Sequence, residues 1–180
     1  GVVFVPVPGL EDRPLLALCP GAEFGGAKRW PAASYGELAR RYLARGWQVA
    51  LFGSANDRAV TGAVRQYTAG HEHCFDLAGR TRLAEAVDLL SLATAVVSND
   101  SGLMHIAAAL ARPLVVIYGA TSPGFTPPLN ANAAIVASAI DCAPCFQREC
   151  PLGHHRCMRD TPVERVAGAL DALLAGAEPR

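Results

Sequence analysis

Short, wholly apolar runs alternate along the chain with longer segments in which apolar residues recur every three or four positions. The runs LLALC (15–19) and PLVVIYG (113–119) predict strands that are buried on both faces. The segment RLAEAVDLLSLA (82–93) is typical of an amphipathic helix, with Leu83 among the residues expected on its buried face. This alternation predicts an α/β fold: a Rossmann-like, doubly wound parallel sheet of five or six strands with helices on both faces.

Polar residues and glycines mark where the helices should begin and end. Ser34 is expected to cap the first long helix, because Glu37 follows three residues later as in a capping box. Gly46 should end that helix, since glycine accepts the left-handed conformation common after helices. Asn56 is the expected cap of the next helix.

Ligands of doubly wound sheets bind at the carboxyl ends of the strands. The loops to inspect are therefore those that follow the predicted strands, after Cys19, Gly53, Ala78, Ser98 and Gly119.

The loop after the fourth strand, SNDSGLMH (98–105), leads directly into a predicted helix that starts near Ser101. Unpaired backbone N–H groups at a helix start attract anions, and Gly102 removes a side chain where a phosphate oxygen would approach. His105 lies one turn further along the predicted helix, on the same side of the helix as Ser101. Asp100 would repel a diphosphate but suits a sugar hydroxyl. The alternative is that Asp100 only caps the helix and His105 is a core histidine.

Two other loops carry candidate binding groups. The loop CPGAEFGGAKRWP (19–31) is rich in glycine and ends near Lys28, which suits a phosphate, although a solvated surface lysine is the alternative. Its spacing is not that of a Walker loop. After the second strand, Asp57 or Asn56 is placed to bind ribose hydroxyls or, equally, to cap a helix. The loop AGRTRL (78–83) offers backbone groups near a base-sized pocket.

Composition excludes several partners. Lys plus Arg and Asp plus Glu number 16 each, so no overall basic field favours nucleic acid or an anionic membrane. Apolar runs are too short to span a bilayer.

Residues 1–13 lack the basic start of a signal peptide and contain two prolines, so they are interpreted as a linker. With 51% hydrophobic residues, the remainder can bury a full core.

Six cysteines are distributed unevenly. Cys19 and Cys74 lie at the ends of apolar runs and are expected to be buried. The other four fall within sixteen residues: Cys142, Cys145, Cys150 and Cys157. Four thiolates suit a tetrahedral structural zinc, although the spacing is tighter than in common zinc ribbons. Disulfides and packed, reduced thiols are the alternatives, and the sequence leaves the three open.

Several of these segments together resemble one family. They are CPGAEFGGAKRWP, LFGS, DLAGRT, SNDSGLMHIAAAL, YGATSPGFTPPL and CAPCFQRECPLGHHRCMRD. They are similar to the C-terminal half of the ADP-heptose:lipopolysaccharide heptosyltransferases of glycosyltransferase family 9, in their heptosyltransferase II group. The resemblance implies one half of a two-domain GT-B fold. Residues 14–180 would form the donor-binding domain, with a cysteine-rich loop at 141–160.

The resemblance also implies roles for individual residues. Lys28 would contact the donor diphosphate and stabilise the leaving group, Asp57 would bind the ribose, and Thr81 would lie near the base. Four residues of one loop would line the diphosphate and heptose: Asp100, Ser101, Gly102 and His105.

The implied reaction is inverting transfer of heptose from ADP-heptose to the lipopolysaccharide inner core, with no obligatory metal. Such enzymes are about twice this length, and their catalytic base lies in the N-terminal half, so this chain is expected to bind the donor without catalysing transfer alone. A lipid-anchored acceptor implies a cytoplasmic protein, peripheral at the inner membrane. The alternatives are a GT-B nucleotide-sugar epimerase half and a non-enzymatic nucleotide- or metal-binding module.

Overall fold

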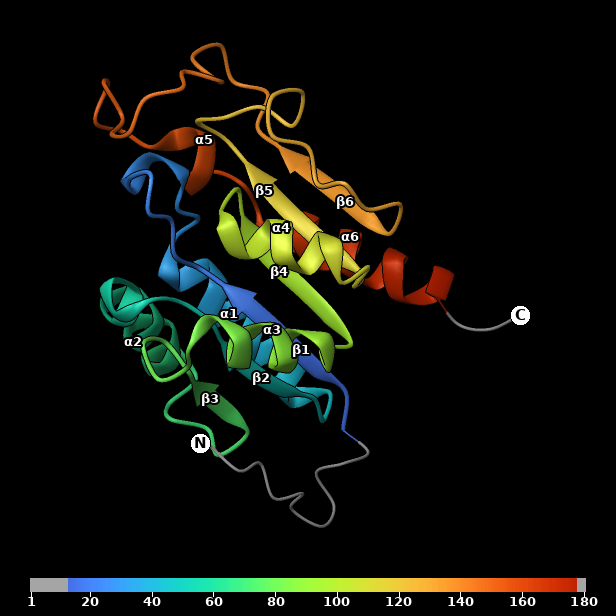
Figure 1. Cartoon of the computed structure of the whole chain (residues 1–180). Helices are drawn as coiled ribbons and strands as arrows, with labels where there is room; N and C mark the ends of the chain where they lie inside the picture. The colour runs from blue at the N-terminus through green and yellow to red at the C-terminus, as the bar shows by residue number, and fades with distance from the viewer. Residues whose placement is uncertain (1–12, 178–180) are drawn as a thin grey trace.

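The computed structural model describes residues 13–177, and its centre is a parallel six-stranded sheet (Figure 1). The strand order is β3-β2-β1-β4-β5-β6, with every neighbouring pair parallel. The strands are β1 (Leu15–Cys19), β2 (Gln48–Leu51), β3 (Cys74–Asp76), β4 (Ala95–Asn99), β5 (Leu114–Tyr118) and β6 (Ala133–Ala137). The predicted doubly wound fold is confirmed. The predicted linker, residues 1–13, lies outside the described residues except for Arg13.

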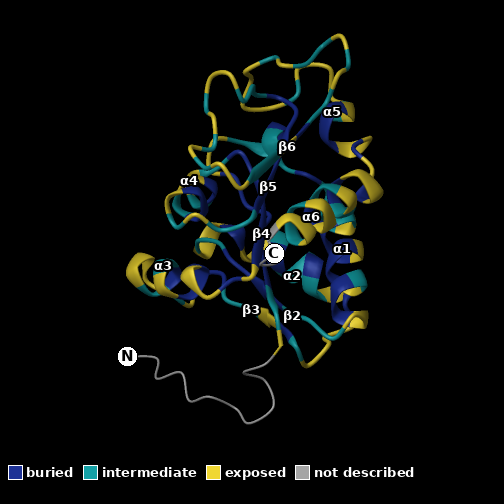
Figure 2. Ribbon diagram, turned by 90° about the vertical axis from the view of Figure 1, so that its right-hand side faces the viewer, coloured by how far each residue is buried: buried dark blue, intermediate teal, exposed yellow. Residues whose placement is uncertain are grey.

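Helices cover both faces of this sheet, as Figure 2 shows with the buried strands between two helical layers. One layer holds α1 (Ala32–Ala44), α2 (Arg58–Tyr67) and α6 (Val163–Ala177), and the short α5 (Arg156–Arg159) joins its core. The other holds α3 (Leu83–Ser91) and α4 (Gly102–Ala109). Two short 3-10 helices, η1 (Gly26–Lys28) and η2 (Ala55–Asp57), follow β1 and β2. No helix among residues 13–177 is long and apolar enough to cross a membrane.

Side chains of each strand alternate between two hydrophobic cores. In β1, Leu16 and Leu18 face the layer of α1 and α6, whereas Ala17 and Cys19 face the layer of α3 and α4. Each fully buried leucine contributes about 1.5–3 kcal/mol relative to an exposed one. Cys19 and Cys74 are buried as predicted, and burial raises the pKa of the Cys19 thiol to about 12.

The first helix begins earlier than predicted. α1 starts at Ala32, with Pro31 as its N-cap, so Ser34 is not the cap and instead donates its backbone N–H to the Pro31 carbonyl at 3.0 Å. Proline accounts for the difference, because its fixed φ suits the entry to a helix and it has no N–H to satisfy. The predicted stop is confirmed: Gly46 follows the C-cap with a φ of 83°.

Two further expectations about helices are wrong. Asn56 does not cap a helix. It lies inside η2, and its backbone N–H donates to the hydroxyl of Ser54, the N-cap of η2; the N-cap residue of α2 is Asp57. Leu83 is 68% exposed instead of buried, because α3 begins at this residue and turns Ala86 and Leu89 toward the core.

Candidate functional site

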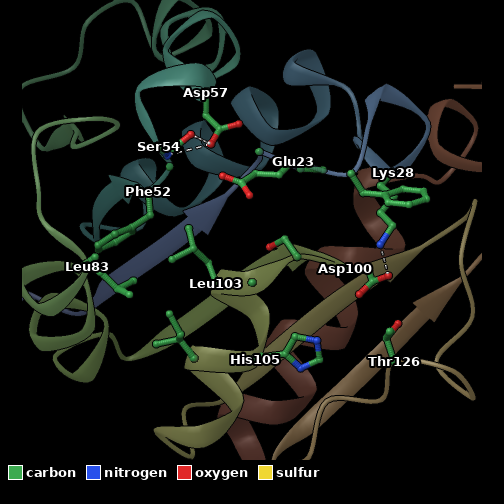
Figure 3. Close-up of a pocket in the computed structure, with 18 of the residues that line it drawn as sticks. Glu23, Lys28, Phe52, Ser54, Asp57, Leu83, Asp100, Leu103, His105 and Thr126 are labelled. Atoms are coloured by element: carbon green, nitrogen blue, oxygen red, sulfur yellow. Dashed lines mark hydrogen bonds and ion pairs between the residues drawn. The ribbon is translucent and has the colours of Figure 1, made fainter. Parts of the chain in front are cut away.

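A cavity of about 630 Å³ opens at the carboxyl edge of the sheet (Figure 3). Loops after all of the first five strands, β1 to β5, contribute to its walls, together with the first turns of α3 and α4. Every donor-site residue predicted from the sequence lines this cavity: Lys28, Asp57, Thr81, Asp100, Ser101, Gly102 and His105. Segments more than 70 residues apart in the chain thus meet where the topology predicts a ligand site.

An ion pair between Lys28 and Asp100 is the dominant electrostatic feature of the cavity (Figure 3). The Lys28 Nζ lies 2.8 Å from Asp100 Oδ2, and the Thr121 hydroxyl donates to the same oxygen at 2.7 Å. The two charged side chains are only 13% and 4% exposed, so Lys28 is not a solvated surface lysine. The ring of Phe24 lies 4.8 Å from the Lys28 ammonium and shields one side of it.

Strand β4 delivers Asp100 and the start of α4 to the cavity. Ser101 is the N-cap of α4 in an extended conformation, and it makes no side-chain capping hydrogen bond. The first N–H groups of the helix therefore keep their partial positive charge, which favours an anion there. The Asp100 carboxylate pairs with Lys28 instead of capping the helix, and His105 is exposed along the cavity wall, so neither alternative interpretation of this loop is correct.

The Asp57 carboxylate, although it borders the cavity, is engaged in a helix cap. Its Oδ2 accepts the backbone N–H of Ser54 at 2.9 Å and the Ser54 hydroxyl at 3.0 Å. Arg29 Nη2 lies 3.8 Å from the other oxygen, and a Cβ at Gly21 would come within 2.4 Å of the Asp57 carboxyl carbon. Of the two interpretations left open by the sequence, the cap is present, and the role of Asp57 in ribose binding stays a prediction.

One residue of the site, Asn99, is missed by the sequence analysis. Its buried side chain accepts the Trp30 backbone N–H at 3.2 Å and the Tyr35 hydroxyl at 3.0 Å, and it donates to the Pro20 carbonyl at 2.9 Å. Asn99 thereby fastens both ends of the Lys28 loop to β4. The feature of the sequence that could have identified Asn99 is its polar amide at the end of a strand that begins with apolar residues.

The part of the cavity opposite the ion pair is apolar. Phe52, Leu83 and Leu103 line it, and Figure 3 shows them on the side away from Lys28. Exposed Leu83 therefore contributes to a ligand surface rather than to the core. A flat apolar wall beside a cationic end suits a molecule that has a ring at one end and phosphate at the other.

The cysteine-rich segment surrounds a second, much smaller cavity, which is lined by Cys142, Cys145, Cys150 and Cys157 with His154. These four thiols are unpaired, so the disulfide interpretation does not hold in this structure. The backbone N–H of His155 donates to Cys150 Sγ at 3.4 Å, and this bond with those of neighbouring amides lowers the pKa of Cys150. Within residues 13–177, no group of three or more His, Cys, Asp or Glu side chains is arranged to hold a metal ion.

The fold and the cavity define a Rossmann-like α/β domain whose ligand site lies at the carboxyl edge of its sheet. The sequence profile of glycosyltransferase family 9 (heptosyltransferase) matches residues 6–156, and the chain therefore belongs to this family.

Individual relatives agree with this assignment. The chain is 47% identical over 169 residues to lipooligosaccharide heptosyltransferase 2 of Haemophilus influenzae, covering 92% of this chain and 49% of that protein. It superposes on the structure of E. coli ADP-heptose lps heptosyltransferase II with a TM-score of 0.83 and 44% identity, covering 93% of this chain and 48% of that one. A family 9 structure from Veillonella parvula, at 22% identity, shares the fold with a TM-score of 0.79. The chain spans about half the length of the curated relatives it matches.

Proposed function

We propose that this chain is the donor-binding half of a heptosyltransferase, which transfers heptose from ADP-heptose to the lipopolysaccharide inner core. The observation that carries the proposal is the Lys28–Asp100 pair facing the start of α4 inside the cavity. A cation and a row of free N–H groups at one place suit a diphosphate. The names of the relatives supply the sugar and the acceptor.

The donor would lie along the cavity from its apolar wall to the ion pair. The adenine would occupy the part near Thr81 and Leu83, with the ribose near Asp57. The diphosphate would bind Lys28 and the first turn of α4, at Ser101 and Gly102. The Asp100 carboxylate would accept hydrogen bonds from heptose hydroxyls, and His105 would donate one to a heptose oxygen. Binding the sugar would explain why a carboxylate lies in a site that otherwise attracts anions.

Transfer would proceed in one displacement with inversion. The acceptor hydroxyl oxygen forms a bond to the anomeric carbon while the bond from that carbon to the β-phosphate oxygen breaks, and the electron pair leaves with ADP. Lys28 and the α4 N–H groups stabilise the growing charge on ADP, as preorganised donors do. The acceptor's proton passes to a base supplied by the acceptor-binding half, so the chain alone would bind the donor without transferring the sugar.

This scheme assigns no metal to the transfer step, because Lys28 and α4 already supply positive charge where the leaving group departs. A zinc ion held by the four cysteines of the 142–157 segment would be structural, fixing that segment ahead of the last helix. We further propose that the protein works in the cytoplasm, peripheral at the inner membrane, since its acceptor would be anchored there.

Calorimetric titration of the chain with ADP and with ADP-heptose tests the proposal, with Lys28→Ala and Asp100→Ala in parallel. We expect ADP to bind, Lys28→Ala to weaken that binding, and Asp100→Ala to abolish the extra affinity that the heptose provides. Glu164→Ala, which alters an exposed carboxylate on α6 outside the cavity, is the control. Equal affinity of all variants for both ligands would contradict the proposal.

A further inference from the structure

The cysteine-rich segment lies directly against the turn that carries Lys28. In Figure 1 the loop preceding α5 lies beside the segment that joins β1 to α1. Two hydrogen bonds connect them: the Ala27 N–H donates to the Arg148 carbonyl at 3.1 Å, and the Gly26 N–H donates to Glu149 Oε1 at 3.0 Å. Gly25 is packed so closely that a Cβ there would lie 2.1 Å from the Arg148 carbonyl oxygen. Three consecutive residues before Lys28 thus rest on two residues of this segment.

Side chains extend the same contact. The guanidinium of Arg148 lies 5.5 Å from the centre of the Phe24 ring, and the Lys28 ammonium lies 4.8 Å from the same ring. The segment also contacts the loop after β5, because the Phe146 N–H donates to the Ala120 carbonyl at 2.7 Å. Ala120 precedes Thr121, whose hydroxyl holds Asp100. Both members of the Lys28–Asp100 pair are therefore supported by one segment from outside the cavity.

Lys28 has a long side chain, and its amine reaches a fixed place only if the backbone beneath it is fixed. That backbone is the three-residue helix η1, which has no side-chain cap of its own. The Glu149 carboxylate accepts the N–H of Gly26, the first residue of η1, and a carboxylate forms a stronger bond to an N–H group than a neutral acceptor does.

We propose that Glu149 is a positioning residue of the donor site: it holds η1 so that the Lys28 ammonium faces the diphosphate. The inference rests on the proposed function. Glu149 does not line the cavity and touches no donor atom in this scheme. Its effect is exerted through Lys28 and is therefore confined to the part of the affinity that depends on the phosphates.

The test compares the dissociation constants of ADP and AMP for the unaltered chain, Glu149→Ala, Glu149→Gln and Lys28→Ala. Loss of one charge-assisted hydrogen bond at an exposed site is expected to weaken ADP binding by about three- to tenfold. AMP binding should weaken less than ADP binding in Glu149→Ala. The preference of this variant for ADP over AMP should therefore fall, as it should in Lys28→Ala. Glu149→Gln, whose amide oxygen can still accept the Gly26 N–H, should recover most of the loss.

Two further variants sharpen the result. Adding Glu149→Ala to Lys28→Ala should cause no further loss of ADP affinity, because the positioned group is already absent. Gly25→Ala displaces the same turn by steric contact with Arg148 and should also lower the preference for ADP over AMP. Glu164→Ala is again the matched acidic control, and it should change neither constant.

The inference is overturned if Lys28→Ala weakens ADP binding while Glu149→Ala leaves it within twofold. It is also overturned if Glu149→Ala weakens ADP and AMP equally, or if the losses in the double variant simply add. If the unaltered chain binds no ADP, the proposed function falls and this inference falls with it. The two failures are therefore distinguishable.

Discussion

Replacing Asn99 with alanine removes the amide that joins the two ends of the Lys28 loop, residues 19–31, to the sheet. Four hydrogen bonds are lost, with the Trp30 N–H, the Tyr35 hydroxyl, the Pro20 carbonyl and, more weakly at 3.4 Å, the Gly21 carbonyl. Each is worth about 1 kcal/mol net, and a buried partner left unpaired costs about 1–3 kcal/mol. Tyr35 keeps a weaker bond to the Cys19 carbonyl at 3.4 Å, which limits the penalty at that hydroxyl. The free energy of unfolding should therefore fall by about 3 kcal/mol.

Urea denaturation followed by circular dichroism measures this effect. With a slope of about 2 kcal/mol per molar urea, a loss of about 3 kcal/mol lowers the midpoint by about 1.5 M. Asn130→Ala is the matched control. The Asn130 side chain makes two hydrogen bonds, to Arg112 and Asn132, in a part-exposed loop that does not line the cavity. That control should lose about 1 kcal/mol or less.

The same substitution should weaken ADP binding, because the loop that carries Lys28 loses both of its attachments to β4. The reasoning is refuted if Asn99→Ala unfolds at the same urea concentration as Asn130→Ala, or if it loses stability while binding ADP as tightly as the unaltered chain.

Two other predictions follow from local geometry. A Cβ at Gly36 would lie 2.2 Å from the Cβ of Tyr67, so Gly36→Ala should destabilise the protein by about 1–3 kcal/mol. A Cβ at Gly62 would have nothing within 4 Å, so Gly62→Ala should stabilise α2 by about 1 kcal/mol. Thermal melts that show the same change in melting temperature for both variants would contradict this. In reduced, chelator-treated native protein, iodoacetamide should modify Cys150 at a lower pH than a free cysteine, because backbone N–H groups lower the pKa of Cys150. The reagent should leave the buried thiol of Cys19 unmodified. Peptide mass mapping that finds Cys19 more reactive than Cys150 would contradict the described burial.

The sheet and the place of the site were predictable because their signals are local. Apolar runs such as 15–19 and 113–119 reveal buried strands, and parallel topology then brings their carboxyl ends together. Residues 100–103 and 105 line the cavity for this reason.

The structure differs from the sequence-based predictions where tertiary contacts determine the local structure. Ser34 has a good capping sequence, yet the backbone leaving the 19–31 loop at Pro31 already starts the helix three residues earlier. Leu83 fits the apolar period of α3 but faces the cavity, which no helical period can reveal. The role of Asn99 depends on Pro20 and Trp30 meeting β4 across more than 65 residues of sequence.

Asp57 illustrates a different limit. A carboxylate after the second strand serves equally well for a ribose or a helix cap, and only the structure shows its bonds to Ser54. The other oxygen of Asp57, Oδ1, lies 3.8 Å from Arg29 Nη2, so a ribose hydroxyl bound there would share it with this guanidinium.

The most direct test of the central claim is a crystal structure of this chain with ADP bound. The account predicts the diphosphate between the Lys28 ammonium and the first turn of α4, with the adenine against the apolar wall that includes Leu83. ADP bound elsewhere on the domain, or bound in this cavity with its diphosphate away from Lys28, would contradict it.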